Sequence, residues 1–218
     1  MKKYEFTGET KQVELLFRTV TLHRIKAVAE FGIVKVGDLG GWIEKEENLS
    51  HEEKAWVCGD ASVYGDAKVY GNAKVYGNAK VYGNAKVYGN AEVWGDAWVW
   101  GNAKVWGDAW VWGNAKVWGD AWVWGNAEVY GNAKVYGNAK VFSISHVLVI
   151  GPIGSRNDFT TFFRDKDSEI TVKCGCFIGK IDKFLEKVCE THGDSKYAIV
   201  YRTAVEIAKQ QIDLSEEK

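Results

Sequence analysis

Four histidines are the side chains best suited to act as a general base near neutral pH, because the imidazole group titrates there. They are His23, His51, His146 and His192, and none lies in the long central segment from residue 55 to residue 144. His146 follows that segment directly, at a position that its alternating pattern predicts to point outward. We therefore expect His146 to be a surface histidine, and the sequence predicts neither a catalytic residue nor an enzymatic activity.

Cys174 and Cys176 flank a glycine, and Cys189 and His192 follow shortly afterwards. A structural zinc site uses four ligands of these types, so these four side chains are the candidate metal set. Cysteines at this spacing on a strand are more often ordinary buried residues, and we expect neither a metal nor another cofactor. Together with Cys58, the cysteines do not form a dense disulfide framework, which favours a reducing, cytoplasmic compartment.

Three basic residues are candidate contacts for an anion. Arg156 lies in the stretch Gly-Ser-Arg-Asn-Asp after the central segment, where a structural ion pair is the alternative explanation. Lys104 and Lys116 lie between tryptophans in the central segment. Aromatic rings with interleaved lysines can stack on bases or sugars and neutralise phosphates, so these residues indicate a site for an anionic or nucleotide-like small molecule.

Tryptophan is the most unusual component of the sequence, because nine of the eleven tryptophans lie in residues 91–126. They replace tyrosine or lysine at positions predicted to point outward, while the inward residues stay constant. Nine exposed indole rings would give a monomer a large apolar surface, and Trp and Tyr are enriched in the cores of protein interfaces. The sequence therefore predicts binding or self-association through Trp94, Trp98, Trp100, Trp106, Trp110, Trp112, Trp118, Trp122 and Trp124.

The elements that must position these side chains are fifteen consecutive six-residue units, which run without insertion from Ala55 to residue 144. Every unit has Ala first and Val third, and all but the last have Gly fifth and Asp or Asn sixth. Alternation over four residues is typical of a strand with Ala and Val on its inner face, and Gly-Asn or Gly-Asp is typical of a turn. Such short strands bury too little alone, so we expect stacked coils in which each strand pairs with its equivalent one coil away.

Coils of 12 and of 18 residues both fit a six-residue unit. Asp96, Asp108 and Asp120 recur every 12 residues, so a 12-residue coil would stack three carboxylates about 4.8 Å apart. That arrangement is unfavourable unless calcium fills the column, whereas an 18-residue coil places Asn between them. We therefore predict an all-β solenoid, a triangular parallel β-helix with 18 residues per coil and about five coils. Its outer surface should carry three aromatic ladders: Tyr76, Trp94, Trp112 and Tyr130; Tyr82, Trp100, Trp118 and Tyr136; and Tyr88, Trp106, Trp124 and Phe142.

The pattern Val-x-Gly-Asn-Ala-x over residues 55–144 resembles the hexapeptide repeat of left-handed parallel β-helix proteins. This resemblance implies a left-handed coil and, because members of that family usually form trimers with parallel axes, a homotrimer. Many members are acyltransferases, which use a base such as histidine beside a subunit cleft and often a loop leaving the coil; these fifteen units contain neither. Residues 2–10 and 36–52 resemble the phage- and prophage-type members, which implies a mobile-element setting and no particular reaction.

The solenoid, predicted over residues 55–156, has a smaller unit on each side. Residues 1–54 are predicted to form a β cap that ends in a Gly-rich turn at Gly37–Gly41. The Ala and Val register continues weakly through Ser145 and Ile153, which predicts one further coil to about Arg156. Caps are required because identical coils leave an open edge that would polymerise.

Residues 157–218 are predicted to form an α+β cap of two strands and two helices. A hairpin is expected around Lys166–Ser168. Apolar residues spaced as on one helix face then predict a helix that ends at Gly193 and a second that begins at Asp194 or Ser195.

Composition excludes several classes of function. A net charge of -1 disfavours binding to duplex DNA. No apolar run approaches the about 20 residues of a membrane helix, and no apolar stretch follows the first lysines, so we expect a cytoplasmic protein with no membrane partner. We expect a non-enzymatic scaffold or binding protein that forms a homo-oligomer. The alternatives are a protein that sequesters a nucleotide-like or other anionic small molecule, for a phage against host defence, and a degenerate acyltransferase.

Overall fold

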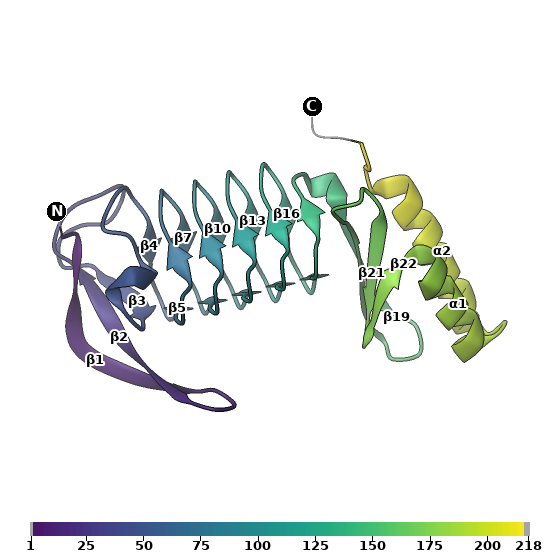
Figure 1. Ribbon diagram of the computed structural model, residues 1–218, viewed down its shortest axis with the longest axis horizontal. Coiled ribbons are helices and arrows are strands. Elements are labelled where there is room, and N and C mark those ends of the chain that lie inside the picture. Colours follow the sequence, from purple (N-terminus) through teal and green to yellow (C-terminus); the bar gives the residue numbers. More distant parts are fainter. Residues whose placement is uncertain (1, 216–218) are drawn as a thin grey trace.

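Each six-residue unit folds into one short strand and one turn in the computed structural model, which describes residues 2–215. Each strand pairs in parallel with the strand 18 residues away, as Val93 does with Val111, so the 18-residue coil is confirmed and the 12-residue coil is wrong. Three strands close each coil, and the stacked coils form three parallel sheets (Figure 1). The predicted fold class, a triangular parallel β-solenoid between an N-terminal β cap and a C-terminal α+β cap, is confirmed.

The three sheets are named here after the feature on their outer surface. The hairpin face consists of β5 (Ser62–Val63), β8 (Lys80–Val81), β11 (Trp98–Val99), β14 (Lys116–Val117) and β17 (Lys134–Val135). The glutamate face consists of β4 (Trp56–Val57), β7 (Lys74–Val75), β10 (Glu92–Val93), β13 (Trp110–Val111) and β16 (Glu128–Val129). The lysine face consists of β6 (Lys68–Val69), β9 (Lys86–Val87), β12 (Lys104–Val105), β15 (Trp122–Val123) and β18 (Lys140–Val141).

The interior of the solenoid is built from the first and third residues of every unit. Each Ala from Ala55 to Ala139 and each Val from Val57 to Val141 is 0% exposed. The predicted inward direction of both residue types is therefore confirmed. The small Ala side chain leaves room for the larger Val side chains that the other strands of the same coil direct to the centre.

Replacing Ala109 with leucine is expected to lower the free energy of unfolding by about 1–3 kcal/mol, because the added methylenes overpack the interior. Lys80→Leu introduces the same side chain at an outward position on the hairpin face and should leave stability nearly unchanged. Thermal unfolding of both variants measures the difference. Equal melting temperatures for Ala109→Leu and the parent protein would contradict tight packing around Ala109.

Columns of Asn and Asp occupy the three corners of the triangle. Asp96, Asp108 and Asp120 each follow an Asn in the coil before, and the Asn amide donates to the carboxylate. The distances are 3.0 Å from Asn78 to Asp96, 3.0 Å from Asn90 to Asp108, and 2.9 Å from Asn102 to Asp120. The corners thus satisfy their own polar groups, and the calcium-filled carboxylate column considered above is not formed.

The N-terminal cap is an antiparallel sheet that joins the solenoid. It contains β1 (Tyr4–Glu14), β2 (Thr19–Ala27), β3 (Leu39–Ile43) and the 3-10 helix η1 (Glu46–Asn48). The prediction of a turn at Gly37–Gly41 is wrong in part, because Gly41 lies in β3, which pairs with β5. A Cβ on Gly41 would lie 2.7 Å from the carbonyl oxygen of Ala61, so this glycine permits close packing of β3 onto the first coil.

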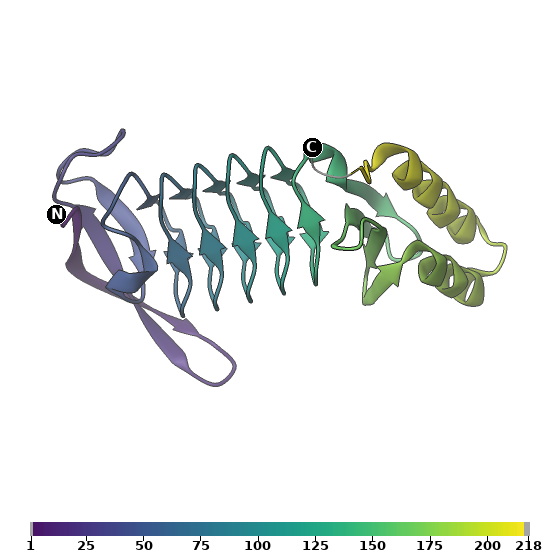
Figure 2. The ribbon, with the colours of Figure 1, turned by 45° about the horizontal axis from the view of Figure 1, so that its top comes forward.

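The β1–β2 hairpin starts at the N-terminal cap and runs obliquely below the first coils of the solenoid (Figure 2). Its side chains Val20 and Leu22 pack against Trp42 and Tyr64, so the hairpin covers the first rungs of the hairpin face. The tip of the hairpin carries Phe17, which is 92% exposed.

The C-terminal cap has a four-stranded antiparallel sheet in the order β19-β20-β21-β22, covered by two helices. Its elements are η2 (Ile144–His146), β19 (Val147–Ile153), β20 (Asp158–Arg164), β21 (Ile170–Cys174), β22 (Phe177–Lys180), α1 (Ile181–His192) and α2 (Lys196–Gln211). The predicted hairpin and both helices are confirmed, with Gly193 after α1 and Ser195 before α2. Two strands of the sheet, β19 and β22, were not predicted.

The further coil predicted to reach Arg156 is not formed. Residues Val147–Ile153 form β19, which pairs antiparallel with β20. The fifteenth unit lacks the Gly-Asn pair that turns the other units, and Ser143 instead begins the 3-10 helix η2, where its side chain accepts from Ser145 N. The regular coils therefore end at β18.

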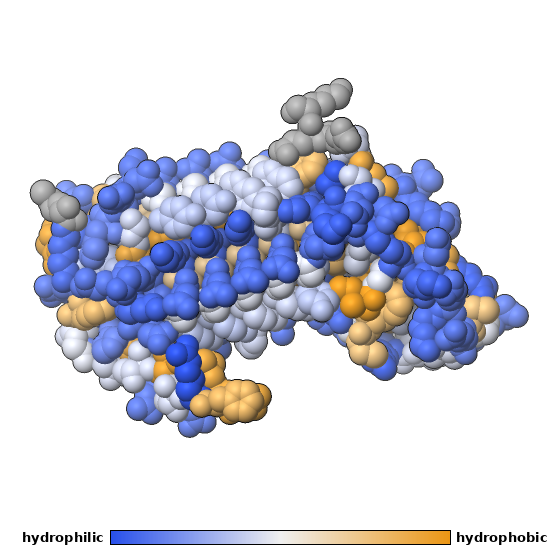
Figure 3. Space-filling view, in the orientation of Figure 1, coloured by the Kyte–Doolittle hydropathy of each residue, from blue (hydrophilic) through white to orange (hydrophobic). Residues whose placement is uncertain are grey.

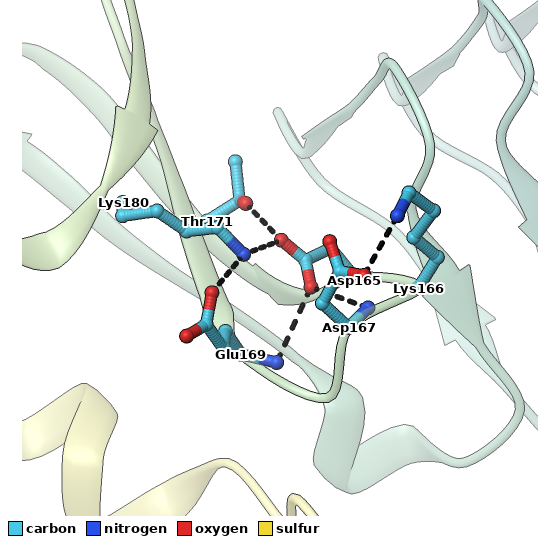
Figure 4. Close-up of polar contacts among 6 residues, drawn as sticks. All are labelled: Asp165, Lys166, Asp167, Glu169, Thr171 and Lys180. Atoms are coloured by element: carbon cyan, nitrogen blue, oxygen red, sulfur yellow. Dashed lines mark hydrogen bonds and ion pairs between the residues drawn. The ribbon is translucent and has the colours of Figure 1, made fainter.

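Asp165 lies where the last coil meets the C-terminal cap. It forms an antiparallel bridge with Ala139, and its carboxylate is almost fully buried, at 1% exposure. The carboxylate accepts hydrogen bonds from Thr171 Oγ1 at 2.7 Å, from the backbone N–H groups of Asp167 and Glu169, and from Lys180 Nζ (Figure 4). This cluster fixes the β20–β21 turn against the end of the solenoid.

Candidate functional site

The outward aromatic residues stack in three continuous ladders, as predicted. Centroids of successive rings lie 5.5, 5.6 and 5.1 Å apart on the glutamate face, 5.8, 4.9 and 4.6 Å on the hairpin face, and 5.6, 5.1 and 5.0 Å on the lysine face. Most of these ring planes are nearly parallel, so neighbouring rings cover each other and leave their edges exposed. Rows of pale and hydrophilic residues accordingly run along the solenoid in Figure 3.

Three further tryptophans lie beside the ladders, one on each face. Trp98, Trp110 and Trp122 contact ladder rings edge to face, with centroids 6.2 Å from Trp100, 5.5 Å from Trp94 and 5.6 Å from Trp106. Trp110 is 43% exposed, the largest exposed fraction among the nine tryptophans. The nine tryptophans thus form three separate clusters.

The lysine face is basic along its whole length. The second residues of its five units are Lys68, Lys86, Lys104, Trp122 and Lys140, and this column contains no carboxylate. Lys104 Nζ lies 4.6 Å from the centroid of the Trp122 ring, and Lys140 Nζ also lies over this ring. Burial there, together with the charge of Lys104, lowers the pKa of Lys140 to about 8.

The glutamate face has the opposite character around its exposed tryptophan. Trp110 lies in register between Glu92 and Glu128 on the strands before and after it. Glu92 pairs with Lys74 at 2.8 Å and accepts a hydrogen bond from Tyr76 Oη at 2.9 Å. Burial and the Glu92 carboxylate raise the pKa of Tyr76, so its hydroxyl remains protonated and donates.

The hairpin face carries a groove of about 480 Å³ along its corner. Lys80 and Lys116 lie over the Trp98 ring, with their Nζ atoms 5.0 and 4.7 Å from the centroid. Lys134 and Asp158, which are 3.8 Å apart, line the groove where it meets the C-terminal cap. The groove therefore combines one flat ring with several ammonium groups.

The three predicted anion contacts are not brought together. Lys104 lies on the lysine face and Lys116 on the hairpin face, while Arg156 lies in the C-terminal cap beside a different cavity. Sequence reasoning missed the acidic flanks of Trp110. The sequence contains a signal for them, because the second residues of units that lie 18 residues apart are Glu92, Trp110 and Glu128 in that order.

The expectation that His146 is a surface residue is wrong. His146 is 1% exposed, and its ring packs perpendicular to Phe142 with centroids 4.1 Å apart. Its Nδ1 atom accepts from the backbone N–H of Phe142 at 3.3 Å. The 3-10 turn of η2 replaces the strand alternation here and directs the imidazole inward.

Cys174, Cys176, Cys189 and His192 do not assemble into the metal site considered above. Within residues 2–215, no group of three or more His, Cys, Asp or Glu side chains is placed to hold a metal ion. All four cysteines are free thiols. None of the described helices is long and apolar enough to cross a membrane.

Comparison of the chain with protein-family models and with curated proteins found no match. The chemistry of the three solenoid faces therefore has to be interpreted from their own residues.

Proposed function

We propose that the protein is a non-enzymatic scaffold whose copies associate through the aromatic surface of the solenoid. The observation that carries this proposal is the opposite charge of the lysine face and the glutamate face. The column of second residues on the lysine face has four lysines and no carboxylate, whereas the glutamate face presents Glu128 and Glu92, the latter paired with Lys74, around the exposed Trp110. Stacked aromatic edges on both faces supply apolar contact area, and the complementary charges select which faces meet.

Opposite charges favour a head-to-tail contact, lysine face on glutamate face, because a two-fold contact between identical faces would oppose like charges. Five rungs make each face about 24 Å long and about 13 Å wide, which is less area than the about 800 Å² per partner of a stable interface. A closed ring uses two faces of every copy and so doubles the buried area. The hairpin face is left on the outside of such a ring.

The number of copies depends on how flat the contact is. The family resemblance implies a homotrimer. Two neighbouring sides of an equilateral triangle meet at about 60°, so strictly flat packing of both faces would close with about six copies. A trimer requires the faces to meet obliquely, near the corners, and the native mass distinguishes the two arrangements.

Charge reversal tests the contact directly. We expect the triple change Lys68→Glu, Lys86→Glu and Lys104→Glu to dissociate the oligomer, and the double change Glu92→Lys and Glu128→Lys to do the same. Combining all five restores opposite charges with reversed sign and should recover association. Multi-angle light scattering during size-exclusion chromatography measures the mass of each variant.

Lys80→Glu on the hairpin face is the matched control and should leave the mass unchanged. A parent protein that is monomeric at micromolar concentration contradicts the proposal. So does a combined variant that associates no better than the two reversed variants.

The groove on the hairpin face supports a second function, the capture of an anionic small molecule with a flat ring. Its Trp98 ring and the ammonium groups of Lys80 and Lys116 are suited to stacking and charge neutralisation. Native mass spectrometry of protein purified from cells should then show a retained ligand that the Lys116→Gln variant retains less well. A parent protein without added mass argues against this second function.

A further inference from the structure

The C-terminal cap contains a cavity of about 370 Å³ that is separate from the solenoid faces. It lies between the loop before β20, the β21–β22 turn and the helices α1 and α2. Its volume is within the range of about 300–1,000 Å³ that small-molecule sites occupy. Arg156, which the sequence predicts to contact an anion, is among its lining residues.

Aromatic rings form one wall of the cavity. Phe184 meets Tyr201 edge to face with centroids 5.6 Å apart, and Phe177 lies 5.3 Å from Phe184. The His192 ring stacks on Tyr201 at 5.7 Å. Phe184 and Tyr201 are buried in this wall, and the partly exposed rings of Phe177 and His192 provide the surface against which a ligand ring can pack.

The polar part of the lining is positively charged. Arg156 and Lys187 line the cavity together with His192, and no Asp or Glu does so among the described residues. Lys187 pairs on the outer side of α1 with Glu190, at 3.0 Å. Arg156 makes no hydrogen bond and no ion pair with any residue in the range 2–215, so its guanidinium is available to an anion.

Two glycines hold Arg156 over the cavity. At Gly154, where φ is +72°, a Cβ would overlap the Tyr201 hydroxyl, so the loop preceding Arg156 lies directly on that ring. At Gly175, where φ is +54°, a Cβ would lie 2.8 Å from Arg156 Nη1, so the guanidinium rests on the β21–β22 turn. A side chain at Gly154 would displace the loop from the Tyr201 ring, whereas a side chain at Gly175 would push the guanidinium of Arg156 aside and strain the backbone at its positive φ.

We propose that this cavity binds a small molecule that joins an aromatic ring to a carboxylate or phosphate group. The ring packs on Phe177 and His192, the partly exposed rings of the lining, and the anion is held by Arg156 and Lys187. Bidentate contact with the planar guanidinium suits both kinds of anion.

Three probes with one ring system test this assignment: 1-naphthyl phosphate, 1-naphthoate and the uncharged 1-naphthol. We expect at least one anion to bind with one molecule per chain in calorimetry, at least tenfold more tightly than 1-naphthol. Comparing phosphate with carboxylate identifies the preferred anion. Arg156→Gln should weaken anion binding at least tenfold and leave 1-naphthol binding unchanged.

The cysteines report where the probe binds. Cys176 is exposed at the cavity, and Cys189 is exposed on α1 outside its lining. A bound anion should slow maleimide alkylation of Cys176 and leave that of Cys189 unchanged, as measured by peptide mass spectrometry in the same chain. Arg202→Gln on α2, which removes an ion pair with Asp194 away from the cavity, should retain this protection.

Three results would each overturn the proposal: failure of both anions to slow alkylation of Cys176, equal protection by 1-naphthol, or unchanged anion affinity in Arg156→Gln. Gly175→Ala provides a second variant that keeps the guanidinium but displaces it. It is expected to weaken anion binding as well, and undiminished binding in that variant contradicts the assigned position of Arg156.

Discussion

Replacing Gly107 with alanine is expected to lower the free energy of unfolding by about 2–5 kcal/mol. Gly107 has φ +70°, a left-handed conformation that costs an alanine about 1–2 kcal/mol. In addition, a Cβ there would lie 3.0 Å from the backbone nitrogen of Gly125 in the next coil. Because backbone atoms of a packed coil cannot move aside as a flexible side chain can, this overpacking adds about 1–3 kcal/mol.

Gly137 separates the two contributions. Its φ is +71°, nearly the same as that of Gly107, but a Cβ on Gly137 would meet no atom within 4 Å. Gly137→Ala should therefore cost only the conformational part, about 1–2 kcal/mol. Urea unfolding of both variants measures the difference, and equal losses of stability would show that stacking between coils places no steric demand on these turns.

Replacing Asp165 with asparagine is expected to cost about 3 kcal/mol, because the buried carboxylate loses charge-assisted hydrogen bonds and its pair with Lys180. This value lies at the lower end of the about 3–5 kcal/mol that breaking a buried ion pair costs. The reason is that Lys180 keeps Glu169 as a partner at 2.5 Å and has a side chain that is 39% exposed. Asp167→Asn in the same turn is the matched control. The Asp167 side chain is 51% exposed, and its replacement should change stability by less than about 0.5 kcal/mol.

The same carboxylate gives stability a defined pH dependence. Burial alone would raise the pKa of Asp165, but hydrogen bonds from Lys180, Thr171 and the backbone outweigh burial and hold it below its ordinary value of 3.8. The resulting stabilisation is fully present above the unfolded-state pKa of about 3.9 and is lost as the pH falls through the folded-state value. Urea unfolding between pH 5 and pH 2 should therefore show a smaller decrease for Asp165→Asn than for the parent, and parallel curves would contradict this role.

Two neighbouring faces of the solenoid give their tryptophans different surroundings although the tryptophans occupy equivalent positions in the repeat. Trp122 lies between Lys104 and Lys140, whereas Trp110 lies between Glu92 and Glu128. A repeat that is uniform inside therefore presents three unlike surfaces outside. These unlike surfaces can support a directional contact between copies.

The sequence alone determined the solenoid, its 18-residue coil and its aromatic ladders. The six-residue period fixes which residues point inward. A 12-residue coil would stack Asp96, Asp108 and Asp120 directly on one another, whereas an 18-residue coil places Asn between them, and this difference excludes the 12-residue coil. Fifteen consecutive units repeat the same local pattern, so one atypical unit does not alter the predicted fold. The α1 and α2 helices followed equally well from their apolar spacing and from Gly193.

Only the tertiary structure decided what happens where the repeat ends. His146 is buried and β19 joins the C-terminal sheet because the fifteenth unit lacks its Gly-Asn turn, and a continuing Ala and Val register could not reveal that change of partner. The cavity of the C-terminal cap likewise joins Arg156, Cys176 and His192, which no period relates. Their proximity depends on a loop, a hairpin turn and two helices packing together, and such long-range packing leaves no signal in the spacing of the residues themselves.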